Sequence, residues 1–201
     1  MVLGVTGGIA TGKSSVTEML VKLGAVSVSA DDIAREAVAP GTAVLQQLCA
    51  YFGESILNAD GTLNRDALAG IVFFDPAARA MLNRITHPAI GRLAEQKLSH
   101  LQAAADYPLI VYEAPLLFEA GAESRVDQVL VVTVEPEIQL QRLIARDGID
   151  HAEATARVAA QMPLTEKIRR ADYLINNSGS LVETEAQVRR LYRELTRRAP
   201  E

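Results

Sequence analysis

The fold is decided by one stretch near the start of the chain, Gly7-Gly8-Ile9-Ala10-Thr11-Gly12-Lys13-Ser14, which fits the pattern G-x-x-x-x-G-K-[ST]. Glycines let a backbone turn tightly and direct N–H groups at phosphate oxygens. A helix that begins near Lys13 would add its positive N-terminal end. The stretch therefore predicts a phosphate-binding loop, in which Lys13 reaches the β- and γ-phosphates and the Ser14 hydroxyl binds Mg²⁺. The residues expected to hold the nucleotide phosphates are Gly8, Ile9, Ala10, Thr11, Gly12, Lys13, Ser14 and Ser15.

The chain on either side of this loop alternates strand-like and helix-like segments. A strand is expected at 2–6 and a helix at 13–23, which ends at Gly24. Further short apolar runs, typical of a buried parallel sheet, predict strands at 25–29, 109–113, 128–134 and 173–176. Pro136 is expected to open a helix. Strand, helix and strand joined by right-handed crossovers predict a doubly wound α/β fold, with a parallel sheet flanked by helices.

Two helical segments interrupt this pattern. The first, 32–105, is interpreted as a helical insert, in which Asp75-Pro76 and His87-Pro88 each predict a cap followed by a proline that starts a helix. The second, 142–169, is rich in Arg and Lys and is interpreted as a mobile lid. The prediction is thus one domain, 1–201, with an insert and a lid.

Composition excludes several classes of protein. The chain has 201 residues, 49% of them hydrophobic, which is average for a globular protein, and no apolar run near the roughly 20 residues of a membrane helix. The net charge of −5 and the absence of Trp argue against a protein that coats nucleic acid. The single cysteine, Cys49, excludes an internal disulfide and is expected in a core. No basic stretch precedes the first apolar residues, so a cytoplasmic protein with no membrane partner and no obligate protein partner is expected.

The class of nucleotide-binding protein is narrowed by motifs that the chain lacks. It has no D-x-x-G with N-K-x-D, as a GTPase would, and no Ser-Gly-Gly-Gln signature of a transporter ATPase. It is also too short for a mechanical ATPase. We therefore expect a small-molecule kinase with a three-layer P-loop kinase fold, an acceptor-binding insert and a lid.

A kinase needs a carboxylate beside the acceptor hydroxyl, and two aspartates follow the second expected strand. Asp31 is predicted to be the catalytic carboxylate, and Asp32 to cap the helix that follows. Glu113 ends the third strand, where it either holds a water of the Mg²⁺ shell or is a charged residue at a strand end with no such role. Arg35, one turn after Asp31, is a candidate for an anionic substrate.

Other charged residues leave alternatives open. Arg142 and Arg146 share a helix face, which suits either phosphate binding or a solvated surface pair. His87 is either a cap or packing residue or a ligand. The arginines of the last helix are expected on its solvated face: Arg189, Arg190, Arg193, Arg197 and Arg198.

In sum the motifs resemble one family, dephospho-CoA kinase, over about 180 residues in register. Besides the loop, the motifs that carry the resemblance are Ala30-Asp31-x-Ile33-Ala34-Arg35, Phe52-Gly53, Asp60-Gly61-x-Leu63-x-Arg65, Ile85-Thr86-His87-Pro88, Pro115-Leu116-Leu117-Phe118-Glu119, Gln139-x-x-Arg142-Leu143-x-x-Arg146, and Gln161 through Lys167 to Ala171-Asp172-Tyr173-x-Ile175-x-Asn177-x-Gly179. The resemblance implies transfer of the γ-phosphoryl group of ATP to the ribose 3′-hydroxyl of dephospho-CoA, which gives CoA and ADP in the final step of coenzyme A biosynthesis.

The resemblance also implies roles for single residues. Arg142 would lie over ATP and Asn177 near the adenine. The acceptor would be bound by residues that belong to the family motifs: Thr6, Asp31, Arg35, Arg65, His87, Pro115 and Leu117. Mg²⁺ would be held by Ser14 and Glu113. One departure concerns Ser29, which stands where the family usually has the first acid of Asp-Ala-Asp.

Overall fold

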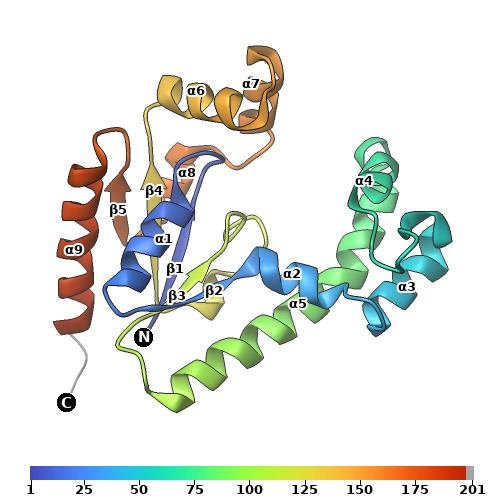
Figure 1. The fold of residues 1–201 in the computed structure, drawn as a ribbon, viewed down its shortest axis with the longest axis horizontal. Coiled ribbons are helices and arrows are strands. Elements are labelled where there is room, and N and C mark those ends of the chain that lie inside the picture. Colours follow the sequence, from blue (N-terminus) through green and yellow to red (C-terminus); the bar gives the residue numbers. More distant parts are fainter. Residues whose placement is uncertain (198–201) are drawn as a thin grey trace. The chain divides into compact units, whose positions relative to one another are not determined.

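The computed structural model describes residues 1–197, and a parallel sheet of five strands forms its centre (Figure 1). The strands are β1 (Val2–Gly7), β2 (Val26–Ser29), β3 (Ile110–Glu113), β4 (Gln128–Thr133) and β5 (Tyr173–Asn176). Their order is β2-β3-β1-β4-β5, and every neighbouring pair is parallel. The predicted α/β fold and its strands are confirmed, with ends displaced by one residue at most.

The helices of the described chain are α1 (Lys13–Lys22), α2 (Ala30–Ala37), α3 (Ala43–Phe52), α4 (Arg65–Phe74), α5 (Pro76–Ala104), α6 (Pro136–Asp147), α7 (His151–Ala159), α8 (Leu164–Arg169) and α9 (Leu181–Arg197). Some of them begin at a residue whose side chain caps the first turn. The Thr42, Asn64 and Asp150 side chains accept hydrogen bonds from the first turns of α3, α4 and α7. Pro136 opens α6, as predicted.

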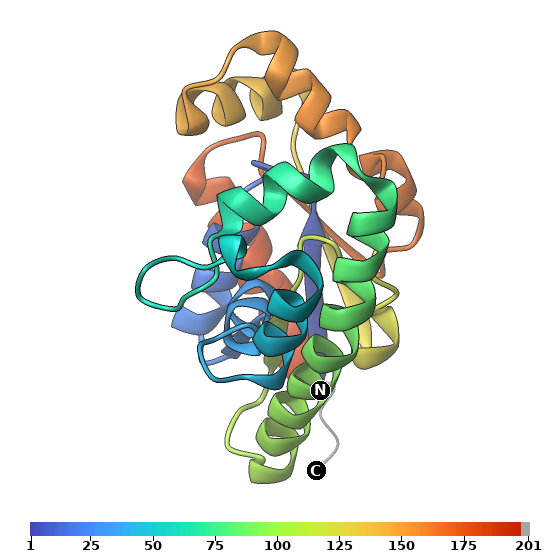
Figure 2. The same ribbon diagram turned by 90° about the vertical axis from the view of Figure 1, so that its right-hand side faces the viewer.

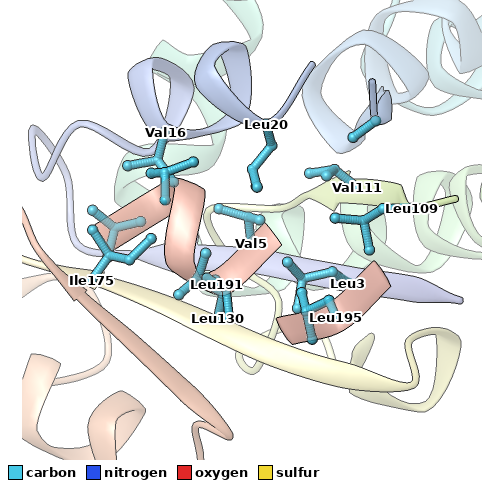
Figure 3. Packing of buried hydrophobic residues seen from close by; sticks show 13 residues of the cluster. Leu3, Val5, Val16, Leu20, Leu109, Val111, Leu130, Ile175, Leu191 and Leu195 are labelled. Atoms are coloured by element: carbon cyan, nitrogen blue, oxygen red, sulfur yellow. The ribbon is translucent and has the colours of Figure 1, made fainter. Parts of the chain in front are cut away.

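Helices α1 and α9 pack against one side of the sheet (Figure 3). Leu3 and Val5 of β1 meet Val16 of α1 and Leu191 of α9 in a core whose members are almost wholly buried. Burial of one such side chain stabilises the fold by about 1.5–3 kcal/mol. This packing holds β1 and α1, and so both ends of the loop between them.

The chain divides into two compact units. One comprises Met1–Ser29 with the chain from Leu98 onward, and the other Ala30–Lys97. The second unit has a core of its own, formed by Val38, Leu48, Ile56 and Leu68. Cys49, predicted to lie in a core, is half-buried and packs against this core without being a member of it.

One predicted helix start is confirmed and one is wrong. The Asp75 carboxylate accepts from the N–H groups of Ala77 and Ala78 at 2.8 and 3.0 Å, so Asp75-Pro76 does start α5. His87-Pro88 starts no helix, because α5 continues through it with Pro88 inside. Proline removes the hydrogen bond to the carbonyl four residues back. That carbonyl belongs to the exposed Arg84, where water can replace the lost donor.

Helices α6, α7 and α8 span most of the segment interpreted as a lid. Figures 1 and 2 both show α6 and α7 beyond the carboxyl end of β4, from which the chain enters α6. Within residues 1–197, no helix is long and apolar enough to cross a membrane. Of the C-terminal arginines, Arg198 lies outside the described residues, while Arg189, Arg190, Arg193 and Arg197 are exposed, as predicted.

Candidate functional site

The backbone of the loop between β1 and α1 has a shape that requires glycine at two positions. Gly7 and Gly12 have φ angles of +153° and +88°. A Cβ at Gly7 would lie 2.5 Å from the Val132 carbonyl oxygen, and one at Gly12 would lie 2.1 Å from the Asn177 amide nitrogen. The loop is therefore packed directly against the end of β4 and the segment after β5.

Lys13 lies inside the curve of this loop. Its side chain is buried, and its Nζ donates to the Gly8 carbonyl at 2.8 Å. The first helical hydrogen bond of α1 runs from Val16 N–H to the Gly12 carbonyl, which leaves the N–H groups of the first turn outside the helical ladder. An ammonium group and a helix N-terminus thus converge at one place, an arrangement suited to phosphate.

Ser14 and Glu113 come from different elements and are joined directly. The Ser14 hydroxyl donates to Glu113 Oε1 at 2.7 Å. Glu113 is the last residue of β3, in register with Val5 of β1 and Ser29 of β2. A hydroxyl and one carboxylate fit Mg²⁺, which binds few protein oxygens and completes its shell with water and substrate phosphates. In the described chain no cluster of three or more acidic, His or Cys side chains offers a cage for a metal.

Asn177 supports the loop from the far side. Its amide donates to the Thr11 carbonyl at 2.9 Å, and its Oδ1 accepts from the Thr184 hydroxyl at 2.9 Å. Thr184 is completely buried on α9. Thr184 was not predicted, although a threonine in line with Val188, Leu191 and Leu195 on an apolar helix face was a usable signal.

Two glutamines hold the tip of the loop. Ile9 N–H donates to Gln161 Oε1 at 2.7 Å, and Gln139 Nε2 donates to the Ile9 carbonyl at 2.8 Å. Gln139 belongs to α6, and Gln161 lies between α7 and α8. Both appear in the motifs above, but no role was predicted for either, because a glutamine has no spacing that marks it as a loop contact.

The segment after β3 is anchored by a buried cation. The Pro115 carbonyl accepts from Lys167 Nζ at 2.9 Å and from the Thr6 hydroxyl at 3.2 Å. Thr6, Leu117 and Lys167 are completely buried. Of the predicted acceptor-binding residues, Thr6 and Leu117 are therefore placed to support this segment from within.

Lys167 is also paired with Glu119, at 2.8 Å between Nζ and Oε1. Burial raises the pKa of the Glu119 carboxyl, but the hydrogen bond and charge of Lys167, with backbone N–H donors, outweigh that effect. The net result is a pKa below the usual value for glutamate.

The two arginines predicted on one face of α6 differ in their surroundings. Arg146 is tied to Asp147, with its Nε 2.7 Å from Oδ1, and Arg157 binds the same carboxylate at 2.8 Å. The hydrogen bond from Arg146 lowers the pKa of Asp147 most, and Arg157 adds to it. Arg142 is half-buried and pairs with none of the described residues. Arg142 is thus available to an anion, whereas Arg146 is engaged in a surface network.

In the second unit, Asp31 and Asp32 lie in the first turn of α2. The helix begins at Ala30, directly after β2, so Asp32 is not its N-cap and that prediction is wrong. The Asp32 carboxylate instead accepts from Arg35 at 2.7 Å on an exposed face. Asp31 is exposed and follows the last residue of β2 by two positions.

A cavity of about 300 Å³ lies within the second unit. Arg65 and His87 line it, as do Asn83 and Thr86, which sequence reasoning missed. Ala34 of α2 also lines it and lies three residues after Asp31, on the same helix face. The other lining residues are apolar, so the cavity offers apolar walls together with one guanidinium and a few polar groups.

A phosphate loop after the first strand of a parallel α/β sheet, with a separate helical unit, defines the class of P-loop kinases. Residues 1–183 match the sequence profile of dephospho-CoA kinase. The chain belongs to the dephospho-CoA kinase family.

Individual relatives agree with this assignment. Dephospho-CoA kinase of Syntrophotalea carbinolica is 54% identical over 188 residues, which cover 94% of this chain and 89% of that protein. The enzyme of Geobacter metallireducens is 48% identical over 200 residues, 100% of this chain and 99% of that protein. The structure of dephospho-CoA kinase from Campylobacter jejuni superposes with a TM-score of 0.76 at 29% identity, covering 98% of this chain and 97% of the other. A structure from Thermus thermophilus superposes with a TM-score of 0.81 at 36% identity, covering 97% of each chain.

Proposed function

We propose that this protein transfers the γ-phosphoryl group of ATP to the ribose 3′-hydroxyl of dephospho-CoA, giving CoA and ADP. The observation that carries the proposal is an intact phosphate loop, with Lys13 and Ser14 in place, in a chain matched to this family over residues 1–183. The reaction would complete the synthesis of coenzyme A.

The donor side of the reaction is assigned to the first unit. Lys13 and the first-turn N–H groups of α1 would bind the β- and γ-phosphates, where negative charge is spread in the transition state. Arg142, which has no partner among residues 1–197, would neutralise further phosphate charge from α6. The hydrogen bond from the Asn177 amide to the Thr11 carbonyl keeps Asn177 beside the loop. This contact supports the assignment of Asn177 to a position near the nucleotide.

Mg²⁺ is assigned to Ser14 and Glu113. A bound Mg²⁺ would supply positive charge that offsets the negative charge of the phosphates. The chain's own contribution is to hold one hydroxyl and one carboxylate 2.7 Å apart before the metal arrives. Ser29, in register with Glu113, is a shorter side chain, so Glu113 would supply the carboxylate at this point of the sheet.

The acceptor side of the reaction is assigned to the helical insert. We propose that residues 32–105 form this insert. Asp31 would accept a hydrogen bond from the 3′-hydroxyl and orient it towards the γ-phosphorus. It would take up the hydroxyl proton as the new O–P bond forms and the bond between the γ-phosphorus and the β-phosphate oxygen breaks, which releases ADP. Arg35, Arg65 and His87 would bind the anionic and polar parts of dephospho-CoA. The lining of the cavity by Arg65 and His87 supports this, because a guanidinium suits the diphosphate of dephospho-CoA and the apolar walls suit the carbon-rich parts of the molecule.

Segment 142–169 is proposed as a lid that excludes water from the γ-phosphate. Pro115 and Leu117 would contribute to acceptor binding by supporting the segment after β3 from within. The enzyme is proposed to act in the cytoplasm on ATP and dephospho-CoA, with no nucleic acid, membrane or obligate protein partner. The single cysteine and the net charge of −5 support that assignment.

The proposal is tested by ADP release from Mg·ATP with one acceptor at a time: dephospho-CoA, AMP, CMP or water alone. We expect rapid release only with dephospho-CoA, and CoA as the second product. Release with AMP or CMP would identify a nucleoside monophosphate kinase instead. ATP binding without transfer to any acceptor would identify a binding protein.

A further inference from the structure

The peptide of Ile9 is held at both of its polar groups by side chains from outside the loop. Gln161 accepts from its N–H and Gln139 donates to its carbonyl. The next residue, Ala10, has a φ of +59°, a left-handed conformation that costs a non-glycine residue energy. A backbone in this conformation must be stabilised by contacts from the surrounding structure. The hydrogen bonds of the two glutamines to Ile9 provide such contacts.

The turn that carries Gln161 is itself fixed. The next residue, Met162, donates its N–H to Glu119 Oε1 at 3.1 Å. Glu119 in turn is paired with Lys167 at 2.8 Å, and the Lys167 ammonium also donates to the Pro115 carbonyl at 2.9 Å. The contacts thus form a continuous line from the segment after β3, through the turn before α8, to the tip of the phosphate loop.

The ion pair of Lys167 with Glu119 holds this series of contacts in place, and Lys167 is completely buried, with 0% of its side chain exposed. A buried ammonium is costly unless it keeps its charged and polar partners. Moving the turn away from Glu119 would strip one partner from that cation. The lid segment is therefore fastened at its C-terminal end, while its Gln161 touches the loop.

We propose that Gln161 is a positioning residue for phosphoryl transfer. Its Oε1 accepts a hydrogen bond from the Ile9 N–H. This bond would fix the conformation of the loop, so that the backbone N–H groups after Ile9 are directed at the phosphates. The Lys167–Glu119 pair holds the turn from which Gln161 acts. The catalytic part of this inference rests on the proposed function. The contact itself shapes the phosphate loop, so its effect on ATP binding can be measured without any transfer.

The test compares Gln161→Met with Gln161→Ala. Methionine keeps the length and packing of glutamine but has no oxygen to accept from Ile9. We expect both variants to raise the KM and the dissociation constant for ATP by about 3- to 10-fold, the worth of one neutral hydrogen bond. The KM for dephospho-CoA and the melting temperature should stay near the wild-type values. The matched control is Gln141→Ala, at an exposed position of α6.

A second variant tests the anchor. Glu119→Gln keeps an oxygen for Met162 N–H but removes the charge that faces Lys167. We expect it to weaken ATP binding in the same direction, and its effect to be less than additive with that of Gln161→Met. Calorimetric titration of ATP provides this measurement without turnover.

Wild-type ATP affinity in Gln161→Met would overturn the inference, as would a loss of affinity in Gln161→Ala alone, which would indicate packing. If the wild-type protein turned over no dephospho-CoA, the proposed function would fail. The weaker ATP binding of Gln161→Met would still hold in that case, so the two failures are distinguishable.

Discussion

The Ser14 hydroxyl and the Glu113 carboxylate lie 2.7 Å apart, although 99 residues separate them in the chain. They meet because β3 is the direct neighbour of β1 and ends beside the phosphate loop. One hydrogen bond therefore joins the start of α1 to the end of β3. It also preorganises two oxygens of the kind that Mg²⁺ prefers.

Removal of the Glu113 carboxylate should change the metal requirement of the reaction. For Glu113→Ala we expect the Mg²⁺ concentration that gives half-maximal ADP formation to rise about 10- to 100-fold. Exposed Glu137 on α6 provides the control, as Glu137→Ala. An unchanged Mg²⁺ dependence in Glu113→Ala would remove this residue from the metal site.

Lys13→Met should abolish most turnover without unfolding the protein. The ammonium is the cation nearest the expected γ-phosphate, and loss of such a group from a preorganised site costs about 10²–10³ in rate. We would measure kcat/KM for ATP, with the exposed Lys22→Met as the control. A variant with near wild-type turnover would show that another cation serves the phosphates.

Asp31→Asn should lower kcat by about 10²–10⁴, the range for loss of a general base. ATP binding should be retained, because Asp31 is assigned to the acceptor and not to the nucleotide. The neighbouring Asp32→Asn, which loses only its pair with Arg35, should have a much smaller effect. Equal losses in the two variants would count against Asp31 as the catalytic carboxylate.

Gly12→Ala tests the close approach between loop and Asn177. The added Cβ would lie 2.1 Å from the Asn177 amide nitrogen, so the loop must shift, and we expect ATP affinity to be lost. Gly148→Ala is the matched control, since its φ is also positive, at +66°, but nothing lies within 4 Å of the new Cβ. Gly148→Ala should carry only the backbone strain, about 1 kcal/mol. Similar ATP affinities in the two variants would contradict the prediction.

The stability of the protein should depend on the ionisation of Glu119. Its pKa in the folded protein is below the usual glutamate value of 4.5, so its contribution to stability is fully present above about pH 4.5 and is lost as the pH falls through the folded-state pKa. The difference in free energy of unfolding between wild type and Glu119→Gln should therefore shrink on acidification below pH 4.5. Denaturant titrations at pH 7, 5, 4 and 3 would measure it, and a constant difference would contradict the prediction.

The sequence by itself determined the features that depend on neighbouring residues. The phosphate loop was readable because Gly12, Lys13 and Ser14 act through one short stretch of backbone. The strands were readable because a buried parallel strand needs a continuous apolar run, as in β4. The start of α5 was readable because an Asp before a proline caps the next helix by itself.

The tertiary structure decided the features that depend on distant residues. Whether Glu113 met Ser14 depended on the strand order, because side chains at neighbouring strand ends converge only when the strands pair. The contact of Gln161 with Ile9 spans 152 residues and has no local pattern. The prediction for His87-Pro88 failed because α5 continues through Pro88, and the carbonyl that loses its donor there belongs to the exposed Arg84. The burial of Lys167 likewise depended on Glu119 and Pro115, since an ammonium leaves water only where the fold supplies its partners.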